Sequence, residues 1–246
     1  MMGKAKGDAM LKEKSLVPEE CDFCDELCAM DIPLLQGIPE DQKRELLAGA
    51  DRVQAPRASL LFQEGDPADT IWIIRCGQVK LCRYEADGRE QIIGIFDRYE
   101  AIWEGLFLDN STYPYSAECL TPVEACGIHL KALQAVLASP EVAMDVIIML
   151  SRKLHDANIR NMLLTTRKPE SRVAGFLLYR KERSTEAWIS LKLEDIAASL
   201  NLRPETVSRK LRELEKLGLI ERIGRGRLHI LDYGGLKALY DGDADE

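Results

Sequence analysis

The chain has 246 residues and a formal net charge of −8; hydrophobic residues make up 46% of it and charged residues 30%. This length favours two compact units joined by a connector, and the composition excludes collagen-like and broadly disordered chains. No apolar run reaches the length of a signal peptide or a membrane span, so we expect a cytoplasmic protein without a membrane partner. Seven cysteines in a reducing compartment favour metal binding or redox sensing over structural disulfides.

Residues 52–130 carry a β pattern. Short apolar runs separated by turn signals occur at 59–62, 70–74, 79–82 and 91–96. Such spacing is typical of an antiparallel barrel or jelly roll. The pair Asp87-Gly88 predicts a hairpin, because both residues tolerate a positive φ. Cys76 and Cys82 belong to strand-like runs, so we expect both to be buried as small apolar side chains.

A long helical pattern spans residues 141–166. The positions that recur at alternating steps of three and four residues are Ile147, Leu150, Leu154, Ala157, Asn161 and Leu164. This spacing predicts a coiled-coil seam through which two copies of the chain form a homodimer. A polar residue on the seam, here Asn161, fixes the register of the pairing. The alternative is an amphipathic helix that packs only on its own domain, and Lys168-Pro169 ends the helix in either case.

The last part of the chain predicts a winged helix-turn-helix. Helical periodicity recurs at 172–180, 192–200 and 204–217. Gly218 ends the third helix, and the strands 219–223 and 227–231 then form a two-stranded ribbon. The acidic tail 241–246 is expected to be disordered.

The chain is therefore predicted to be an α+β protein with four parts. These are a cysteine-containing segment at 1–30, an effector-sensing antiparallel β-roll at 31–136, a dimerisation helix at 137–168, and a DNA-binding domain with the acidic tail at 169–246. The net charge of the chain is −8, but residues 201–231 hold eight basic and four acidic side chains. This segment therefore has a formal charge of +4, and the rest of the chain has a formal charge of −12. The local distribution of charge sets the field that a DNA phosphate meets.

The candidate recognition helix begins at Pro204, which is tolerated there because the first-turn amide has no intrahelical partner. Glu205, Ser208 and Arg209 project from the first turns, where a recognition helix meets base edges. Arg209 can donate two hydrogen bonds to guanine, Glu205 can accept one from a cytosine amino group, and Ser208 can contact a neighbouring base. Thr206 is included in this DNA-binding set. The cations expected to bind phosphate are Arg203, Lys210, Arg225 and Arg227. The alternative is a solvated charged face, or a winged helix that binds protein.

Several segments resemble the CRP/FNR superfamily of bacterial transcription regulators. They are residues 32–37, 62–66, 73–80, 170–174 and 204–209. The resemblance implies a roll like that of cyclic-nucleotide-binding domains, and a hairpin at 85–90 that contacts RNA polymerase. The pattern Glu-x-x-Ser-Arg in the reading helix is similar to the FNR branch, which implies a palindrome of TTGAT-like half-sites. Tyr115 stands where the nucleotide-binding branch has an arginine, so we do not expect cyclic AMP or cyclic GMP as the ligand.

A tight group of thiols, Cys21, Cys24 and Cys28, precedes the roll. The spacing C-x2-C-x3-C brings three thiolates within reach of one metal centre. In FNR-like proteins a fourth cysteine lies in the roll, and the resemblance assigns that place to Cys126, with Cys119 as the second choice. The implied cofactor is a [4Fe-4S] cluster that responds to oxygen, nitric oxide or redox state.

Other signals remain open at this stage. Zinc, or a thiol-disulfide switch, could use the same cysteines. Haem, bound through His129 or His155, is less favoured. A small organic effector in the roll would use aromatic residues, of which the candidates are Trp72, Trp103, Tyr113 and Tyr115. An enzyme of the cupin type is not expected, because cupin metals need paired histidines and the roll contains one.

Overall fold

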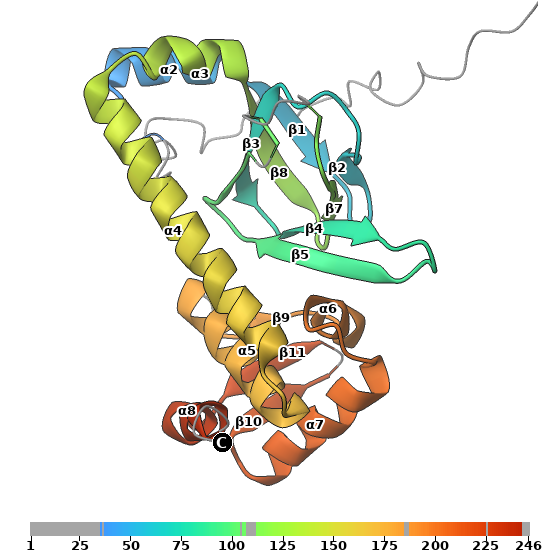
Figure 1. The fold of residues 1–246 in the computed structure, drawn as a ribbon. Helices are drawn as coiled ribbons and strands as arrows, with labels where there is room; N and C mark the ends of the chain where they lie inside the picture. Colours follow the sequence, from blue (N-terminus) through green and yellow to red (C-terminus); the bar gives the residue numbers. More distant parts are fainter. Residues whose placement is uncertain are drawn as a thin grey trace, which may run out of the picture.

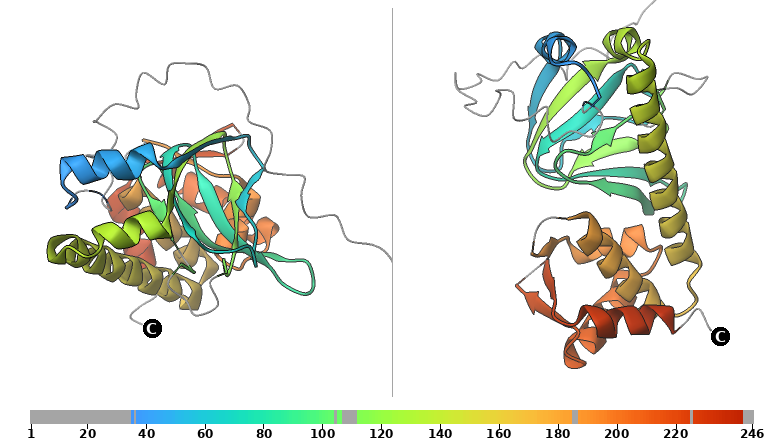
Figure 2. Two further views of the ribbon diagram at one scale, coloured as in Figure 1. Left: turned by 90° about the horizontal axis from the view of Figure 1, so that it is seen from above. Right: turned by 90° about the vertical axis from the view of Figure 1, so that its left-hand side faces the viewer.

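The computed structural model describes residues 35, 37–103, 105–106, 112–184, 187–224 and 226–242. A β-roll, one long helix and a C-terminal winged helix domain follow one another along the chain, and the long helix runs past the roll to the C-terminal domain (Figures 1 and 2). This arrangement confirms the predicted α+β fold class.

Two antiparallel four-stranded sheets form the roll. The first has the order β1 (Asp51–Ala55), β8 (Val123–His129), β3 (Thr70–Cys76) and β6 (Ala101–Ile102). The second has the order β2 (Leu60–Phe62), β7 (Ser116–Cys119), β4 (Val79–Tyr84) and β5 (Glu90–Phe96). Branched side chains such as Ile71, Ile74 and Leu81 are at most 1% exposed and fill the space inside the roll. Between β4 and β5 the predicted hairpin is present, with Gly88 at a φ of +82°.

The prediction for one of the two strand cysteines is wrong. Cys82 is fully buried, as expected, but Cys76 is exposed. Cys76 is the last residue of β3, and the pairing with β8 shifts in register between Ile74 and Cys76. The alternation that directs a side chain inward is therefore broken at this strand end, and the turn at Gly77, with a φ of +88°, follows directly.

In the part of the chain that the structure describes, three helices accompany the roll: α2 (Glu40–Ala48), α3 (Leu130–Val136) and α4 (Pro140–Thr165). The predicted long helix is present as α4, which begins with Pro140 in its first turn. Its first half contributes Val142 and Val146 to the core of the roll, and its last turn contributes Leu163 to the core of the C-terminal domain. No single helix in the described ranges is long and apolar enough to cross a membrane, although α3 and α4, bent by 120° at their junction, meet the test as a pair.

The C-terminal domain contains the predicted winged helix-turn-helix. Its elements are α5 (Pro169–Arg183), β9 (Ile189–Ser190), α6 (Leu193–Ser199), α7 (Pro204–Lys216), β10 (Ile220–Ile223), β11 (Arg227–Ile230) and α8 (Tyr233–Asp241). The ribbon has three strands, in the order β10–β11–β9, and not the predicted two. The short strand β9 has only two residues, which is too little for a periodic signal. The helix α8 was also not predicted; the Asp232 carboxylate caps it by accepting a hydrogen bond from the Gly235 amide.

Buried ion pairs join the roll to the C-terminal domain. Arg180 of α5 is 3% exposed; it donates to the Asp97 carboxylate at 2.8 Å and to the Ile95 carbonyl at 3.1 Å. From the roll, the Lys80 ammonium lies 3.8 Å from the carboxylate of Asp195 in α6. The two domains are thus held in one orientation by charges that burial makes costly to separate.

Candidate nucleic-acid interface and regulatory sites

The face of α7 that points away from the protein carries the predicted reading residues. Val207, Leu211 and Leu214 are at most 2% exposed and anchor the opposite face of the helix in the domain core. Glu205 and Arg209 are exposed and lie one turn apart on the outer face. Among the described residues, Arg209 makes no ion pair or hydrogen bond. Its five donors are therefore available to a ligand, as base readout by arginine requires.

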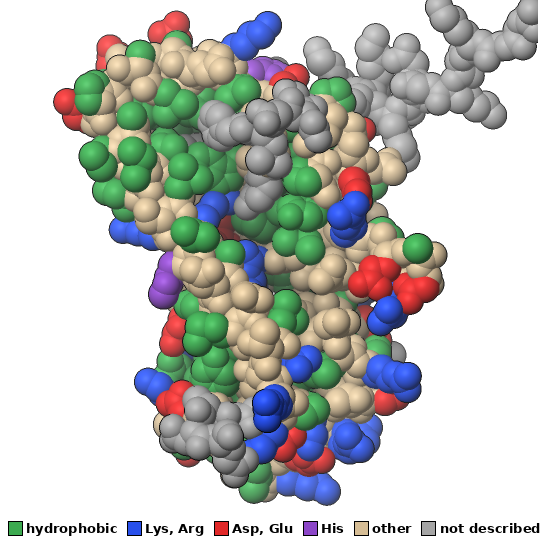
Figure 3. Space-filling model, viewed as in Figure 1, with side chains coloured by type: hydrophobic (Ala, Val, Ile, Leu, Met, Phe, Trp, Pro, Cys, Tyr) green, Lys and Arg blue, Asp and Glu red, His purple; other side chains and the backbone are tan. Residues whose placement is uncertain are grey.

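The other predicted contacts divide into three groups. Arg203, at the N-cap of α7, is exposed, and Thr206 and Ser208 are half-buried beside the reading residues. Lys210 is held by Glu213 at 2.8 Å and by Glu170 of α5 at 3.1 Å, so it ties α7 to α5. Arg225 lies outside the described residues. Figure 3 shows lysine and arginine side chains gathered over the end of the molecule that contains α7.

A stacked group supports the wing. The Arg227 guanidinium lies 5.3 Å from the centre of the Trp188 ring, and the His229 ring is 4.8 Å from the same indole. A cation over an indole face is attracted by the ring quadrupole, so Trp188 orients Arg227 at the surface. No sequence pattern predicts this role for Trp188, because the residue lies in a connection without periodicity and contacts residues of β11 that are distant in the sequence.

The predicted seam residues form an exposed stripe along α4. All six of them are exposed in the single chain; Leu154 is 63% exposed, Ile147 54% and Leu150 49%. The inner face of the helix, with Val142, Val146 and Leu163, is buried. Hydrophobic side chains gather along the side of the molecule on which α4 lies (Figure 3). An exposed apolar stripe of this length is typical of an interaction surface.

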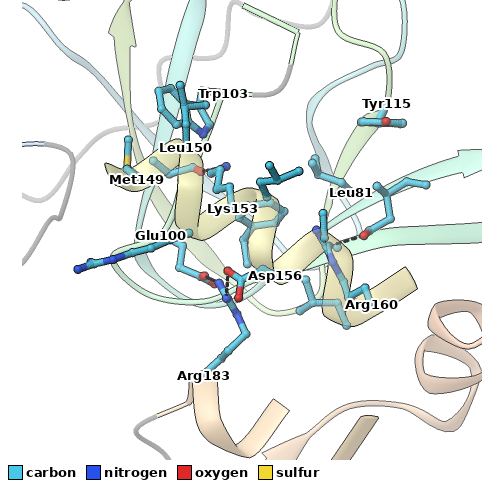
Figure 4. A pocket seen from close by; sticks show the side chains of 18 of the residues that line it. Leu81, Glu100, Trp103, Tyr115, Met149, Leu150, Lys153, Asp156, Arg160 and Arg183 are labelled. Carbon is cyan, nitrogen blue, oxygen red and sulfur yellow. Dashed lines mark hydrogen bonds and ion pairs between the residues drawn. The ribbon is translucent and has the colours of Figure 1, made fainter. Parts of the chain in front are cut away.

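A cavity of about 630 Å³ lies where the roll, α4 and α5 meet. Figure 4 shows Trp103, Met149 and Leu150 at one end, Glu100, Asp156 and Arg183 at the other, and Lys153 between the two groups. Two of the four aromatic residues predicted to contact an organic effector, Trp103 and Tyr115, line this cavity, whereas Trp72 and Tyr113 do not. Tyr113 instead stacks on Phe62 inside the roll, with ring centres 3.7 Å apart.

The predicted cysteine ligands fall mostly outside the described part of the chain. Cys21, Cys24 and Cys28 are not among the described residues. Cys126 lies in β8 and is 8% exposed; it does not belong to the hydrophobic core cluster of the roll. Cys119 is 1% exposed and belongs to that cluster, and burial raises the pKa of its thiol. Of the two candidates for the fourth ligand, Cys126 therefore has the less enclosed thiol.

A second group of donors lies where the roll meets α6. Cys82, Glu90 and Glu118 place their ligand atoms within 4.8 Å of one another. The Lys80 ammonium lies 2.6 Å from the Glu90 carboxylate and 3.5 Å from that of Glu118. A lysine thus already supplies positive charge to these carboxylates, and we interpret the group as an ion-pair network that supports the domain contact.

The two strand cysteines are expected to react very differently with iodoacetamide. Burial, aided by the negative charge of Glu90, raises the pKa of the Cys82 thiol to about 12, so at pH 8 only roughly one thiol in ten thousand is a thiolate. Cys76 is exposed at its strand end. Peptide mass spectrometry after brief labelling of the folded protein should find Cys76 alkylated and Cys82 unmodified. Equal labelling of both would show that β4 does not hold Cys82 in the core.

The two histidines considered for haem lie on separate elements. His129, at the end of β8, is 3.2 Å from the Asp51 carboxylate and 3.3 Å from the Thr70 hydroxyl. His155 is an exposed residue of α4. His129 thus already has polar partners, and the described residues bring no second histidine to either side chain.

A β-roll followed by a long helix and a winged helix-turn-helix defines a class of DNA-binding transcription regulators. Two family models match: the cyclic nucleotide-binding domain over residues 52–139 and the Crp-like helix-turn-helix domain over residues 171–239. The nitrogen fixation regulation protein FixK of Azorhizobium caulinodans is 30% identical over 193 residues, which cover 74% of this chain and 76% of that protein. The chain belongs to the CRP/FNR family of transcription regulators.

Two further similarities span most of the chain. The transcriptional activator protein anr of Pseudomonas aeruginosa is 27% identical over 244 residues, which cover 96% of this chain and 98% of that protein. The solved structure of FixK2 from Bradyrhizobium japonicum has the same fold, with a TM-score of 0.71 and 23% identity over 77% of this chain and 96% of that one. The two relatives are a transcriptional activator and a nitrogen fixation regulation protein, in agreement with the family assignment.

Proposed function

We propose that the protein is a homodimeric cytoplasmic regulator that reads a palindrome of TTGAT-like half-sites. The observation that carries this proposal is the combination of an exposed apolar stripe on α4 with an exposed Arg209 on the outer face of α7, to which no described residue is paired. Pairing two copies along Ile147, Leu150, Leu154, Ala157, Asn161 and Leu164 would bury the stripe. It would also set two recognition helices about 34 Å apart, one turn of DNA, so that both half-sites contribute to the affinity.

Within each half-site, some of the protein's side chains contact bases and others contact phosphates. Arg209 donates to guanine, Glu205 accepts from a cytosine amino group, and Thr206 and Ser208 fill the space beside them. Arg203, Arg225 and Arg227 bind phosphate, and Lys210 contributes positive charge from its place between α7 and α5. The hairpin at 85–90, whose Asp87 and Arg89 side chains are exposed and paired at 2.6 Å, is the surface offered to RNA polymerase.

The signal is proposed to enter through the cysteines. Cys21, Cys24 and Cys28 would bind a [4Fe-4S] cluster together with Cys126, whose thiol is less enclosed than that of Cys119. A bound cluster supplies an inorganic centre that oxygen or nitric oxide attacks. The polypeptide's part would be to link the three N-terminal cysteines to β8 through Cys126. Loss of that tether would free the segment and weaken the pairing of α4.

Anaerobic purification tests the sensor. We expect about four irons and four sulfides per chain, with a broad visible absorption that air bleaches. Cys126→Ser should lower the iron content, whereas Cys76→Ser, which changes an exposed thiol at a strand end, should leave it unchanged. Iron retained in Cys126→Ser and lost in Cys119→Ser would move the fourth ligand to Cys119. Metal-free protein from anaerobic cells would contradict the cluster and favour a thiol-disulfide switch, without affecting the DNA-binding proposal.

A further inference from the structure

The short strand β9 brings an aromatic ring to the outer face of the wing. β9 pairs with β11, with Ile189 opposite Leu228. Both of these side chains are buried, at 4% and 3% exposed, so they point into the core of the domain. Trp188 precedes Ile189, and Arg227 and His229 lie on either side of Leu228. Because neighbours along an extended chain point to opposite faces, these three side chains share the outer face of the ribbon.

Two rings and a guanidinium group are in contact on this face. The His229 ring lies 4.8 Å from the Trp188 ring, centre to centre, with an angle of 37° between the planes. The guanidinium carbon of Arg227 lies 5.3 Å from the centre of the same indole. A cation within about 6 Å of an aromatic ring centre is attracted to the ring, and indole attracts it more strongly than phenol or phenyl. The half-buried Trp188 ring thus holds the Arg227 side chain.

The strand register keeps acidic side chains away from Arg227. Its cross-strand neighbours are Ile223 in β10 and Ser190 in β9, and neither carries a charge. Glu221, the acidic residue of β10, lies opposite His229 instead. Within the ranges that the structure describes, no carboxylate lies within ion-pair distance of Arg227. The indole therefore takes the place that a carboxylate has at many surface arginines, and the positive charge of Arg227 is not neutralised.

Holding an arginine by stacking leaves its hydrogen-bond donors available. The guanidinium group stacks through its flat face, whereas its five N–H donors point outward in the plane of the group. A carboxylate would occupy such donors, as Glu170 and Glu213 do with those of Lys210. A side chain that is already held in the free protein also loses less conformational freedom when it binds a ligand.

We propose that Trp188 is a positioning residue for DNA binding, and that its indole holds the Arg227 guanidinium at the surface of the wing for a DNA phosphate. This inference rests on the phosphate contact proposed above for Arg227, and it adds the group that holds the cation in place. In a dimer the stack would act once at each half-site of a palindrome, so both copies would contribute to the affinity.

Substitutions that keep or remove the aromatic face test the proposal in the full-length protein. Trp188→Leu keeps an apolar side chain without a ring, and it should weaken binding to a palindromic duplex roughly fivefold or more. Trp188→Phe keeps a ring and should lose less affinity than Trp188→Leu. A random duplex should show the same order, because a phosphate contact does not read bases. Fluorescence anisotropy at one fixed salt concentration measures the affinities, and thermal melting followed by circular dichroism checks the folding of each variant.

A double substitution separates positioning from a general structural role. Arg227→Gln should weaken both duplexes roughly tenfold or more. Adding Trp188→Leu to it should cause no further loss, because the ring would then have no cation to hold. Additive losses, or full affinity in Trp188→Leu, would overturn the positioning role and leave the phosphate contact of Arg227 standing. Full affinity in Arg227→Gln would instead contradict that phosphate contact, and the positioning role with it.

Tyr233→Leu is the matched control. Tyr233 is a 43% exposed aromatic residue of the same domain, and its hydroxyl donates to the Glu182 carboxylate. This variant also exchanges a ring for an apolar side chain, and it should bind both duplexes as the unmodified chain does. A loss as large as that of Trp188→Leu would assign the effect to aromatic packing in the domain and overturn the proposal.

Discussion

Replacing Leu154 with glutamate is expected to convert the proposed dimer into monomers. Leu154 is the most exposed of the large apolar residues on α4, at 63%, and it occupies the middle of the predicted seam. In a symmetric pair the substitution would bury two like charges without partners, at a cost of about 3 kcal/mol or more, which is roughly 100-fold in the dissociation constant. Sedimentation equilibrium of the two proteins at matched concentrations measures the change directly.

A neighbouring position supplies the control for this substitution. His155 follows Leu154 and is also exposed, but it lies off the predicted seam, so His155→Glu should remain dimeric. Affinity for a palindromic duplex should fall in Leu154→Glu and be retained in His155→Glu, because only a dimer engages both half-sites. If the Leu154→Glu protein stayed dimeric, the predicted seam on α4 would be wrong. The alternative, that this helix packs only within its own chain, would then be favoured.

Removing the Arg209 side chain is expected to abolish most sequence discrimination at one base pair. The residue has no partner among the described side chains and is exposed on the outer face of α7, so Arg209→Ala should leave the fold intact. Its loss should cost about 1 to 3 kcal/mol on the specific duplex, or roughly 5- to 150-fold in affinity. On a random duplex the affinity should change little. Fluorescence anisotropy with both duplexes at one fixed salt concentration separates the two effects.

Arg203→Ala provides the comparison. Arg203 is exposed at the N-cap of α7, where a cation binds phosphate without reading a base. Its removal should weaken specific and random duplexes to a similar degree and lower the salt dependence of both. Should Arg209→Ala behave like Arg203→Ala, the assignment of base reading to Arg209 would be wrong.

The parts of this fold that were predictable are those with a local signal. The sequence pattern predicts α7 to within one residue, because Pro204, the apolar spacing and Gly218 mark its start, face and end. The exposed stripe on α4 followed from a repeat within one helix in the same way. Sequence patterns do not identify residues that depend on contacts distant in the sequence: Trp188 against Arg227, Arg180 against Asp97, and the contribution of α4 and α5 to the cavity. Cys76 was misplaced because a register shift at the end of β3 has no signature in composition.

The way the hydrophobic interior is divided bears on how the protein unfolds. Cys82, Ile92 and Ile95 belong to strands of the roll, yet they pack into the interior of the C-terminal domain, together with Leu163 from the end of α4. A fragment cut at the junction near Lys168 would expose these side chains to water, and it would leave Lys80 without Asp195. We therefore expect the intact chain to unfold in a single cooperative transition. The isolated roll would expose these apolar side chains and would aggregate unless another protein surface buried them.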